Sequence, residues 1–569
     1  MSRYSSARLI ALLAMTTPFS ITSCSPLETS SDPVSAARQF IVQHDSKIRP
    51  LEKAMGLAWW SANTTGRDED FHAKEEAQNK IDAALADPAR FAELKRTREL
   101  LKKKPGIDPL LARQVEVLYL QYLEKQVDPS LLKAMAARSN AVEKAFNVYR
   151  ARVDGKEMSD SEVRKVLKES RDSVLLRKVW EASKAVGAAV ESDLKELVRL
   201  RNQAAKQLGF KNFHAMMLEL NEQKQESVIA LFDEIHELTG EPFRTMKAEI
   251  DAKLATAHGI SPAALRPWHY QDPFFQESPS IYDTDLDSAF KEADILNLCR
   301  KFYASIGLPI DDVIARSDLY EKPGKSPHAF CTDIDREGDV RVLANIVPNE
   351  RWMSTMLHEL GHAVYSSKNI PQSMPYVLRS EAHILTTEGI AMLFERFSSK
   401  AAWLSARGVK IADAKAFEET AVRMRRNRLL IFAAWCQVML RFEKGMYENP
   451  EQDLNQLWWD LVEKYQLLKR PEGRSAPDFA SKIHIVSAPA YYHNYLMGQL
   501  FASQLHATIS SEVLKVAPPA ASYDGNPEVG EFLKLRVFAP GRSLPWNDLT
   551  RFATGAELNA KAFAAELGR

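Results

Sequence analysis

This 569-residue chain has few cysteines and no formal net charge, and each of these two features excludes a class of protein. The four cysteines, at positions 24, 299, 331 and 436, are too few and too far apart for a disulfide framework or a thiolate zinc site. Cys436 lies in the apolar stretch FAAWCQVML, which predicts a buried thiol. The 75 basic and 75 acidic residues leave a formal net charge of +0, without the basic excess of a nucleic-acid-binding protein. We therefore expect no nucleic-acid partner.

Glycine and proline are also few, with 22 and 28 residues, while residues that favour helices fill long stretches. We expect a mostly α protein. The chain lacks a repeat of fixed period and a linker after residue 40, so residues 36–569 are predicted to form one large helical domain in two halves around a deep cleft. Residues 259–283, rich in proline and aromatics, predict an irregular loop. Strand-like residues 328–331 and 340–343 flank the turn-like DREGD, which predicts a small β-hairpin.

The start of the chain lacks an apolar run long enough to cross a membrane, because LIALLAM at residues 9–15 is too short. Arg3 and Arg8 precede this run, and small residues follow it up to Cys24, which is the pattern of a secretory signal. Cys24 resembles the cysteine of a bacterial lipobox. The pattern predicts a signal peptide at residues 1–23, acylation of Cys24 and a polar tether at residues 24–35. A plain signal peptide is the alternative. A lipid anchor implies the bacterial cell envelope, and Ser25 is compatible with the outer membrane, facing the periplasm.

The most informative stretch is residues 351–366, RWMSTMLHELGHAVYS. It lacks proline and carries apolar residues at helical spacing, so we predict a helix. His358 and His362 are four residues apart, share one face of that helix and can reach one metal ion. Glu359 is placed to act on a water molecule, as in H-E-x-x-H metallopeptidases. A chance pattern on an amphipathic helix is the alternative, but the apolar flanks favour a zinc site.

A catalytic zinc ion takes three protein ligands, so a third ligand must come from elsewhere in the chain. Residues 380–398, SEAHILTTEGIAMLFERFS, are predicted to form a second helix. Glu381, Glu388 and Glu395 are seven residues apart and would share one face of it. Their spacing alone does not choose among them, although apolar neighbours make a solvated face awkward at Glu388.

These motifs resemble the angiotensin-converting-enzyme family of peptidyl-dipeptidases, zinc peptidases of the gluzincin type, over roughly residues 35–510. The resemblance implies that Glu388, which follows His362 by 26 residues, is the third zinc ligand. The family also keeps an aspartate four residues past this glutamate to orient a ligand histidine, and Met392 stands there in this chain. The partner of the zinc histidines is therefore left open, with Glu381 and Glu395 as candidates.

Two later segments carry the same resemblance. In SKIH at residues 481–484, Lys482 matches a lysine that binds the terminal carboxylate of the substrate, and His484 matches a histidine that supports the scissile carbonyl. In AYYHNYL at residues 490–496, Tyr495 takes the place of the transition-state tyrosine. Tyr492 takes that of a carboxylate-binding tyrosine, with Tyr491 as a rival.

Earlier segments supply further substrate contacts by the same resemblance. His328 and Ala329 match the strand along which the peptide backbone lies, and Gln271 in PWHYQDPFF matches a carboxylate-binding glutamine. The animal members bind chloride through arginines, and the positions aligned with them hold Lys206, Val462 and Asn494. We therefore expect no chloride activation.

The resemblance implies one Zn²⁺ ion and a peptidase that acts on peptides with a free C-terminus, releasing dipeptides. Glu359 would be the general base, and His484 and Tyr495 would stabilise the oxyanion. The alternatives are a zinc oligopeptidase or a single-residue carboxypeptidase on the same scaffold, or a non-catalytic peptide-binding lipoprotein. The intact Glu359 argues against the last of these.

Overall fold

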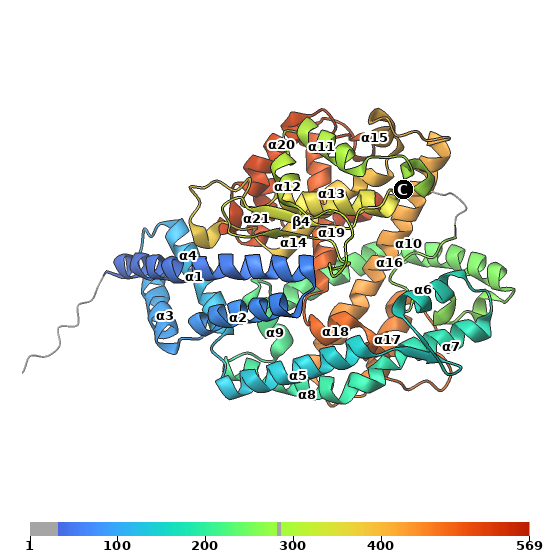
Figure 1. The fold of residues 1–569 in the computed structure, drawn as a ribbon, viewed down its shortest axis with the longest axis horizontal. Coiled ribbons are helices and arrows are strands. Elements are labelled where there is room, and N and C mark those ends of the chain that lie inside the picture. The colour runs from blue at the N-terminus through green and yellow to red at the C-terminus, as the bar shows by residue number, and fades with distance from the viewer. Residues whose placement is uncertain (1–31, 282–285, 568–569) are drawn as a thin grey trace, which may run out of the picture.

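The computed structural model describes residues 32–281 and 286–567. The predicted signal peptide and Cys24 lie outside the described residues. Those residues are mostly helical, with two small antiparallel sheets, and this confirms the predicted fold class (Figure 1). Among the described helices, none is both long enough and apolar enough to cross a bilayer.

The helices and strands follow one another in this order. The first part of the chain contains α1 Pro33–Thr65, α2 Asp68–Leu85, α3 Pro88–Lys102, α4 Pro109–Glu124, α5 Pro129–Val148, β1 Ala151–Val153, β2 Lys156–Met158, α6 Asp160–Glu169, α7 Ser173–Lys184, α8 Val186–Gln207, α9 Phe213–Leu220 and α10 Gln225–His258. The second part contains α11 Ile295–Ser305, α12 Asp311–Arg316, β3 Phe330–Asp333, β4 Val340–Leu343, α13 Glu350–Val364, α14 Ile384–Glu395, α15 Ala401–Ala406, α16 Ala414–Glu448, α17 Leu454–Gln466, α18 Ile483–Ser487, α19 His493–Thr508, α20 Pro527–Leu533, α21 Trp546–Thr554 and α22 Lys561–Leu567. Short 3₁₀ and π turns connect several of them.

Four of the first five helices begin at an Asp-Pro pair. Asp32, Asp87, Asp108 and Asp128 each accept a hydrogen bond from a backbone N–H of the first turn, and proline takes the first helical position. Proline fits there because that N–H has no partner within the helix, and its φ angle is already helical. As a result α1 begins at Pro33, so residues 33–35 belong to this helix and not to the predicted tether.

The predicted hairpin is present as β3 and β4, paired antiparallel with Phe330 opposite Leu343. Its first strand begins two residues later than the sequence suggested. Helix α1 packs across it, with the rings of Trp59 and Phe330 4.2 Å apart at their centroids. A side chain at Gly56 would meet the Ile334 carbonyl oxygen at 2.9 Å, so only glycine permits this contact. The hairpin is thus held between α1 and α13.

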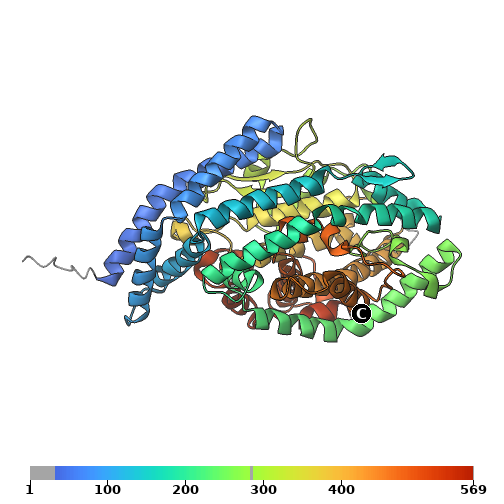
Figure 2. The same ribbon diagram turned by 90° about the horizontal axis from the view of Figure 1, so that it is seen from below.

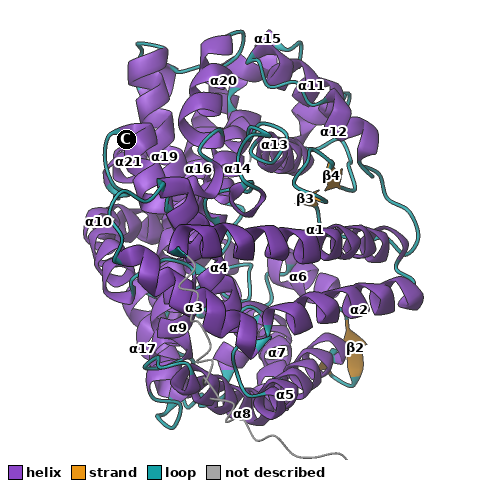
Figure 3. Cartoon of the chain, turned by 90° about the vertical axis from the view of Figure 1, so that its left-hand side faces the viewer, coloured by secondary structure: helices purple, strands orange, loops and turns teal. Residues whose placement is uncertain are grey.

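The helices are arranged in an upper and a lower part in Figure 1, and α16 extends between them. Helices α13 and α14 belong to the upper part, and α17 and α18 to the lower part (Figure 1). Seen from below, α1 and α10 lie along opposite sides of the molecule (Figure 2). Figure 3 shows β3 and β4 beside α13, far from β2. One large apolar core includes residues from both parts, and a smaller one joins α1–α4.

Candidate metal centre and active site

His358 and His362 lie one turn apart on α13 with their Nε2 atoms 3.2 Å from each other. Glu388 on α14 brings its Oε2 atom to 3.5 Å from Nε2 of His358 and 3.9 Å from Nε2 of His362. Three atoms that each bind zinc at about 2.0–2.2 Å lie roughly this far apart in a tetrahedral site. The donor set and its spacing therefore fit one zinc ion. Within the part of the chain that the structure describes, this is the one cluster found to be suited to a metal ion.

The other nitrogen of each imidazole is already bonded. Nδ1 of His358 lies 2.8 Å from Oε2 of Glu395, and Nδ1 of His362 lies 2.7 Å from Oγ1 of Thr387. These contacts fix both rings and leave the Nε2 atoms for a metal ion. Glu395 therefore orients His358 in place of the family's aspartate, at a position one turn beyond Met392. The contact of Thr387 with His362 was not predicted. The one feature of the sequence that points to it is that Thr387 directly precedes Glu388.

Three glycines allow the helices of this centre to approach each other closely. A side chain at Gly361 would meet Cα of Ala391 at 2.8 Å, and one at Gly498 would meet Cβ of Glu388 at 2.9 Å. A side chain at Gly389 would meet the Phe501 ring at 2.6 Å. The contacts join α13 to α14 and α14 to α19, so glycine at these positions places Glu388 within reach of the two histidines.

Glu359 is 8% exposed and lines a cavity of about 660 Å³ together with the three metal-site residues. Burial raises its pKa to about 7, while the neighbouring His358 acts in the opposite direction. A carboxyl group with this pKa can take up and release a proton near neutral pH. Burial lowers the pKa of His362 to about 4, so its imidazole is neutral, as a metal ligand must be. At His358, burial is outweighed by the hydrogen bonds to Glu388 and Glu395, which raise the pKa of that imidazole.

Glu381 does not lie on the helix that carries Glu388, contrary to the prediction. Helix α14 begins at Ile384, because His383 has extended backbone and its Nδ1 accepts a hydrogen bond from the N–H of Leu385. Glu381 still lines the metal cavity, and burial raises its pKa to about 7. Glu381 makes no hydrogen bond or ion pair with His358 or His362, whereas Glu395 bonds to His358, so Glu395 is the orienting residue of the two candidates.

Lys482 lies at the N-terminus of α18 and donates from Nζ to Oε1 of Gln276 at 2.5 Å. Its Nζ is 5.3 Å from the ring centroid of Tyr492. Burial lowers the pKa of Lys482 to about 8. Gln271 instead accepts from the N–H of Ser280 at 2.8 Å. The contacts therefore favour Gln276 as the glutamine beside Lys482, which the sequence did not indicate because both residues lie in one irregular loop.

A second buried cation lies near Lys482. Nζ of Lys184 is 3.2 Å from the ring centroid of Phe274, and Nζ of Lys482 is 5.4 Å from the same centroid. Burial lowers the pKa of Lys184 to about 7. The two lysines therefore share one aromatic ring, and the carboxylate of Asp272 acts on both. No pattern in the sequence groups Lys184 with Lys482.

His484, Tyr492 and Tyr495 lie next to one another. The ring centroid of His484 is 4.8 Å from that of Tyr492 and 6.4 Å from that of Tyr495. Tyr495 lines the metal cavity. Nδ1 of His484 is buried without a hydrogen-bond partner, and burial lowers the pKa of this imidazole to about 4. A neutral ring with an unpaired nitrogen can donate to a substrate oxygen. Tyr491, the rival to Tyr492, has its ring 5.3 Å from that of Tyr495.

The segment that carries these tyrosines is fixed by a buried carboxyl group. Oε1 of Glu443 accepts from the N–H of Ala490 at 2.9 Å, where the backbone has a φ of 54°. Burial raises the pKa of Glu443 to about 8.

Ala329, directly before β3, lines the metal cavity, whereas His328 lines another cavity of about 880 Å³.

The fold and the site define a mostly helical protein with a His-His-Glu cluster suited to a metal ion and a buried glutamate beside it. The family model described as angiotensin-converting enzyme matches residues 31–267 and 268–565, so the chain belongs to this peptidase family. It is 24% identical over 443 residues to the angiotensin-converting enzyme-like protein Ace3 of Mus musculus, covering 71% of this chain and 58% of that protein. It is 23% identical to the angiotensin-converting enzyme of Rattus norvegicus, covering 71% of this chain and 33% of that protein. The chain thus spans less than two thirds of these relatives' own length.

Proposed function

We propose that this protein is a zinc-dependent peptidase that releases dipeptides from the C-terminus of peptides. The observation that carries the proposal is the convergence of His358, His362 and Glu388, with Glu359 buried beside them. When bound, zinc supplies Lewis acidity toward a peptide carbonyl and lowers the pKa of a bound water toward 7.

Glu359 takes a proton from the attacking water on its carboxylate and passes it to the nitrogen of the leaving amine. Burial of Glu359 raises the pKa of its carboxyl group, which favours uptake of this proton. His484 and the Tyr495 hydroxyl donate hydrogen bonds to the oxygen of the tetrahedral intermediate. One such donor is typically worth about 2.7–4 kcal/mol.

Lys482, Tyr492 and Gln276 hold the carboxylate at the substrate's C-terminus, and Gln276 replaces the predicted Gln271 in this role. The peptide backbone on the other side of the scissile bond lies along Ala329 and β3, and His328 precedes this strand on the side of the other cavity. A fixed distance between the carboxylate group and the metal centre selects which bond is cut.

Mass spectrometry of products from the purified, zinc-loaded protein tests the proposal directly. We expect dipeptides from peptides with a free C-terminus and none from C-terminally amidated ones. Single residues would indicate a carboxypeptidase, and internal fragments from amidated peptides an oligopeptidase. If a peptide library stays uncleaved both with and without a chelator, the protein binds peptides without hydrolysing them.

We also propose that acylation of Cys24 anchors the protein in a bacterial cell envelope, in the outer membrane facing the periplasm. The lipobox-like end of the apolar segment supports this proposal. Labelling of growing cells with a palmitate analogue should mark the wild-type protein and not Cys24→Ser. Equal labelling of both would contradict it.

A further inference from the structure

One charged side chain of the metal cavity has no role in the proposed mechanism. Glu381 is half-buried and lines this cavity together with Asp333 and Arg336. The backbone N–H of the next residue, Ala382, donates to the hydroxyl of Tyr365 at 3.1 Å, and Tyr365 directly follows α13. The segment that carries Glu381 is therefore fixed against the end of the helix that holds the two histidines.

The charged neighbours of Glu381 are bonded to other groups. The two carboxylate oxygens of Asp333 accept from the backbone N–H of Arg336 at 2.9 Å and from that of Ser367 at 3.0 Å. The guanidinium group of Arg336 donates from Nη2 to Oε1 of Glu52 at 2.9 Å. Within residues 32–281 and 286–567, no other side chain bonds to the carboxylate of Glu381, and the charge of Asp333 acts on it more strongly than that of Arg336. Glu381 therefore brings a negative charge without a bonded cation into the cavity.

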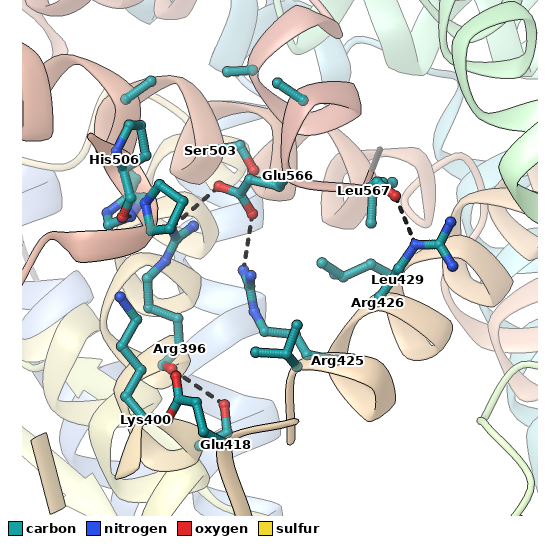
Figure 4. Close-up of a pocket in the computed structure, with 17 residues that line it drawn as sticks. Arg396, Lys400, Glu418, Arg425, Arg426, Leu429, Ser503, His506, Glu566 and Leu567 are labelled. Atoms are coloured by element: carbon teal, nitrogen blue, oxygen red, sulfur yellow. Dashed lines mark hydrogen bonds and ion pairs between the residues drawn. The ribbon is translucent and has the colours of Figure 1, made fainter. Parts of the chain in front are cut away.

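A cavity between α16, α19 and α22 provides a contrast (Figure 4). There Nη1 of Arg396 lies 3.2 Å from Oε1 of Glu566, and Nη2 of Arg425 lies 3.1 Å from Oε2 of the same residue. The protein itself thus pairs the carboxylate of Glu566, whereas it leaves that of Glu381 without a cation. A half-buried carboxylate of this kind gains free energy when a cationic group of a ligand bonds to it.

Glu381 lies beside the strand that is proposed to hold the peptide. Burial raises the pKa of the Cys331 thiol on β3, and the charges of Glu381 and Asp333 add to this effect. Cys331 and Asp333 are two residues apart and share one face of the strand, whereas the ring of Phe330 packs against Trp59 on the other face. The side chains of a peptide that pairs with β3 alternate in the same way, so every second one faces the side of Glu381.

We propose that Glu381 selects peptides with a basic side chain at the first or second residue before the scissile bond. This inference rests on the proposed function, because that function places the peptide along β3. The ammonium group of a lysine or the guanidinium group of an arginine pairs with the Glu381 carboxylate, and the methylene groups of either side chain lie against Cys331 and Ile384, which line the same cavity. An acidic side chain at this place is repelled.

Hydrolysis of a peptide series by the zinc-loaded protein tests this preference. N-acetylated peptides share one C-terminal dipeptide and carry lysine, norleucine or glutamate at either of the two positions before the scissile bond. At one of these positions we expect kcat/KM for lysine to exceed that for norleucine about tenfold or more, with glutamate lowest. Assays at pH 8 keep most of the Glu381 carboxylate ionised, because burial raises its pKa to about 7. Equal kcat/KM for the three residues at both positions would overturn the proposal and leave the peptidase activity standing, whereas release of no dipeptide from any peptide would overturn the proposed function and this inference with it.

Variants of Glu381 assign the preference to this residue. Glu381→Gln keeps the size of the side chain and removes its charge, so kcat/KM should fall about tenfold for the lysine peptide and change less than about twofold for the norleucine peptide. Glu381→Lys should reverse the order of the lysine and glutamate peptides. Glu321→Gln is the matched control, because Glu321 is exposed and does not line the cavity, and it should keep the wild-type order. An unchanged lysine preference in Glu381→Gln would overturn the assignment.

Discussion

The two ends of the proposed active site are built in different ways. At the metal end, His358, His362 and Glu388 all lie on helices that glycines bring into close contact. At the carboxylate end, Lys482 and Gln276 lie in irregular segments outside the α-helices. The comparison shows that helical spacing fixes side-chain geometry at one end, whereas individual side-chain contacts with the backbone fix it at the other.

The irregular end depends on strained backbone held by single side chains. Phe275 has a φ of 51°, and the Nε2 atom of Gln466 donates to the carbonyls of both Phe274 and Phe275 at 2.9 Å. Left-handed backbone at a bulky residue costs about 1–3 kcal/mol and persists only where its surroundings enforce it. The effect of a substitution should therefore be harder to predict at the carboxylate end than at the metal end. Five predictions compare the two ends.

The largest effect is expected at the metal end from Glu359→Gln. This variant keeps the shape of the side chain and the three metal ligands but removes the base. We expect kcat to fall by about 10²–10⁴-fold with zinc content unchanged, measured by peptide hydrolysis and atomic absorption. His358→Ala is the matched control that loses the metal ion itself. Retention of most activity in Glu359→Gln would rule out Glu359 as the base.

Glu395→Gln should weaken zinc binding about 10–100-fold, because the hydrogen bond that orients His358 loses its charged acceptor. The zinc dissociation constant in a chelator competition measures the effect. Glu381→Gln is the control, since Glu381 lines the same cavity but is not bonded to a zinc histidine. Equal zinc affinity in the two variants would remove Glu395 from its positioning role.

At the carboxylate end, Gln276→Ala should raise KM roughly tenfold for a peptide with a free C-terminus, as expected for one hydrogen bond to a charged group. Gln271→Ala should change KM less, because Gln271 bonds to the backbone of Ser280. The kinetics of the two variants on the same peptide decide between the two glutamines. A larger effect at Gln271 would restore the residue that the family resemblance predicted.

The pH dependence of kcat/KM should reflect Lys482. Burial lowers the pKa of this ammonium group to about 8, so its positive charge is present below that pH and lost above it. We expect kcat/KM for free C-termini to fall above pH about 8, by up to tenfold per unit. The Lys482→Arg variant retains its charge, so this decline should shift to higher pH. A flat profile to pH 10 in the wild type would contradict the assignment.

The smallest effect is expected from chloride. Asn494 accepts from the Gln223 amide at 2.7 Å, Val462 is buried and Lys206 is exposed, so the positions aligned with the family's arginines lack a cationic clamp. We expect the same turnover in sodium chloride and sodium acetate at equal ionic strength. A several-fold rise with chloride alone would contradict this prediction.

The sequence predicted the metal end well because its signals are local. Two histidines four residues apart share a helix face in any fold, and the structure confirms the helix at Glu350–Val364. The hairpin followed from alternating residues and a turn. In contrast, the predicted second helix was too long, because the cap at His383 competes with helix formation in a way that composition does not show. This error placed Glu381 on the wrong element.

By itself the sequence determined that the protein is helical, that His358 and His362 share a helix face suited to a metal ion, and that Glu359 accompanies them, since these follow from periodicity and short-range spacing. Only the tertiary structure decided which residues orient the histidines and which glutamine meets Lys482. Each of these depends on side chains brought together from distant parts of the chain, and such contacts are set by packing rather than by any pattern along the sequence.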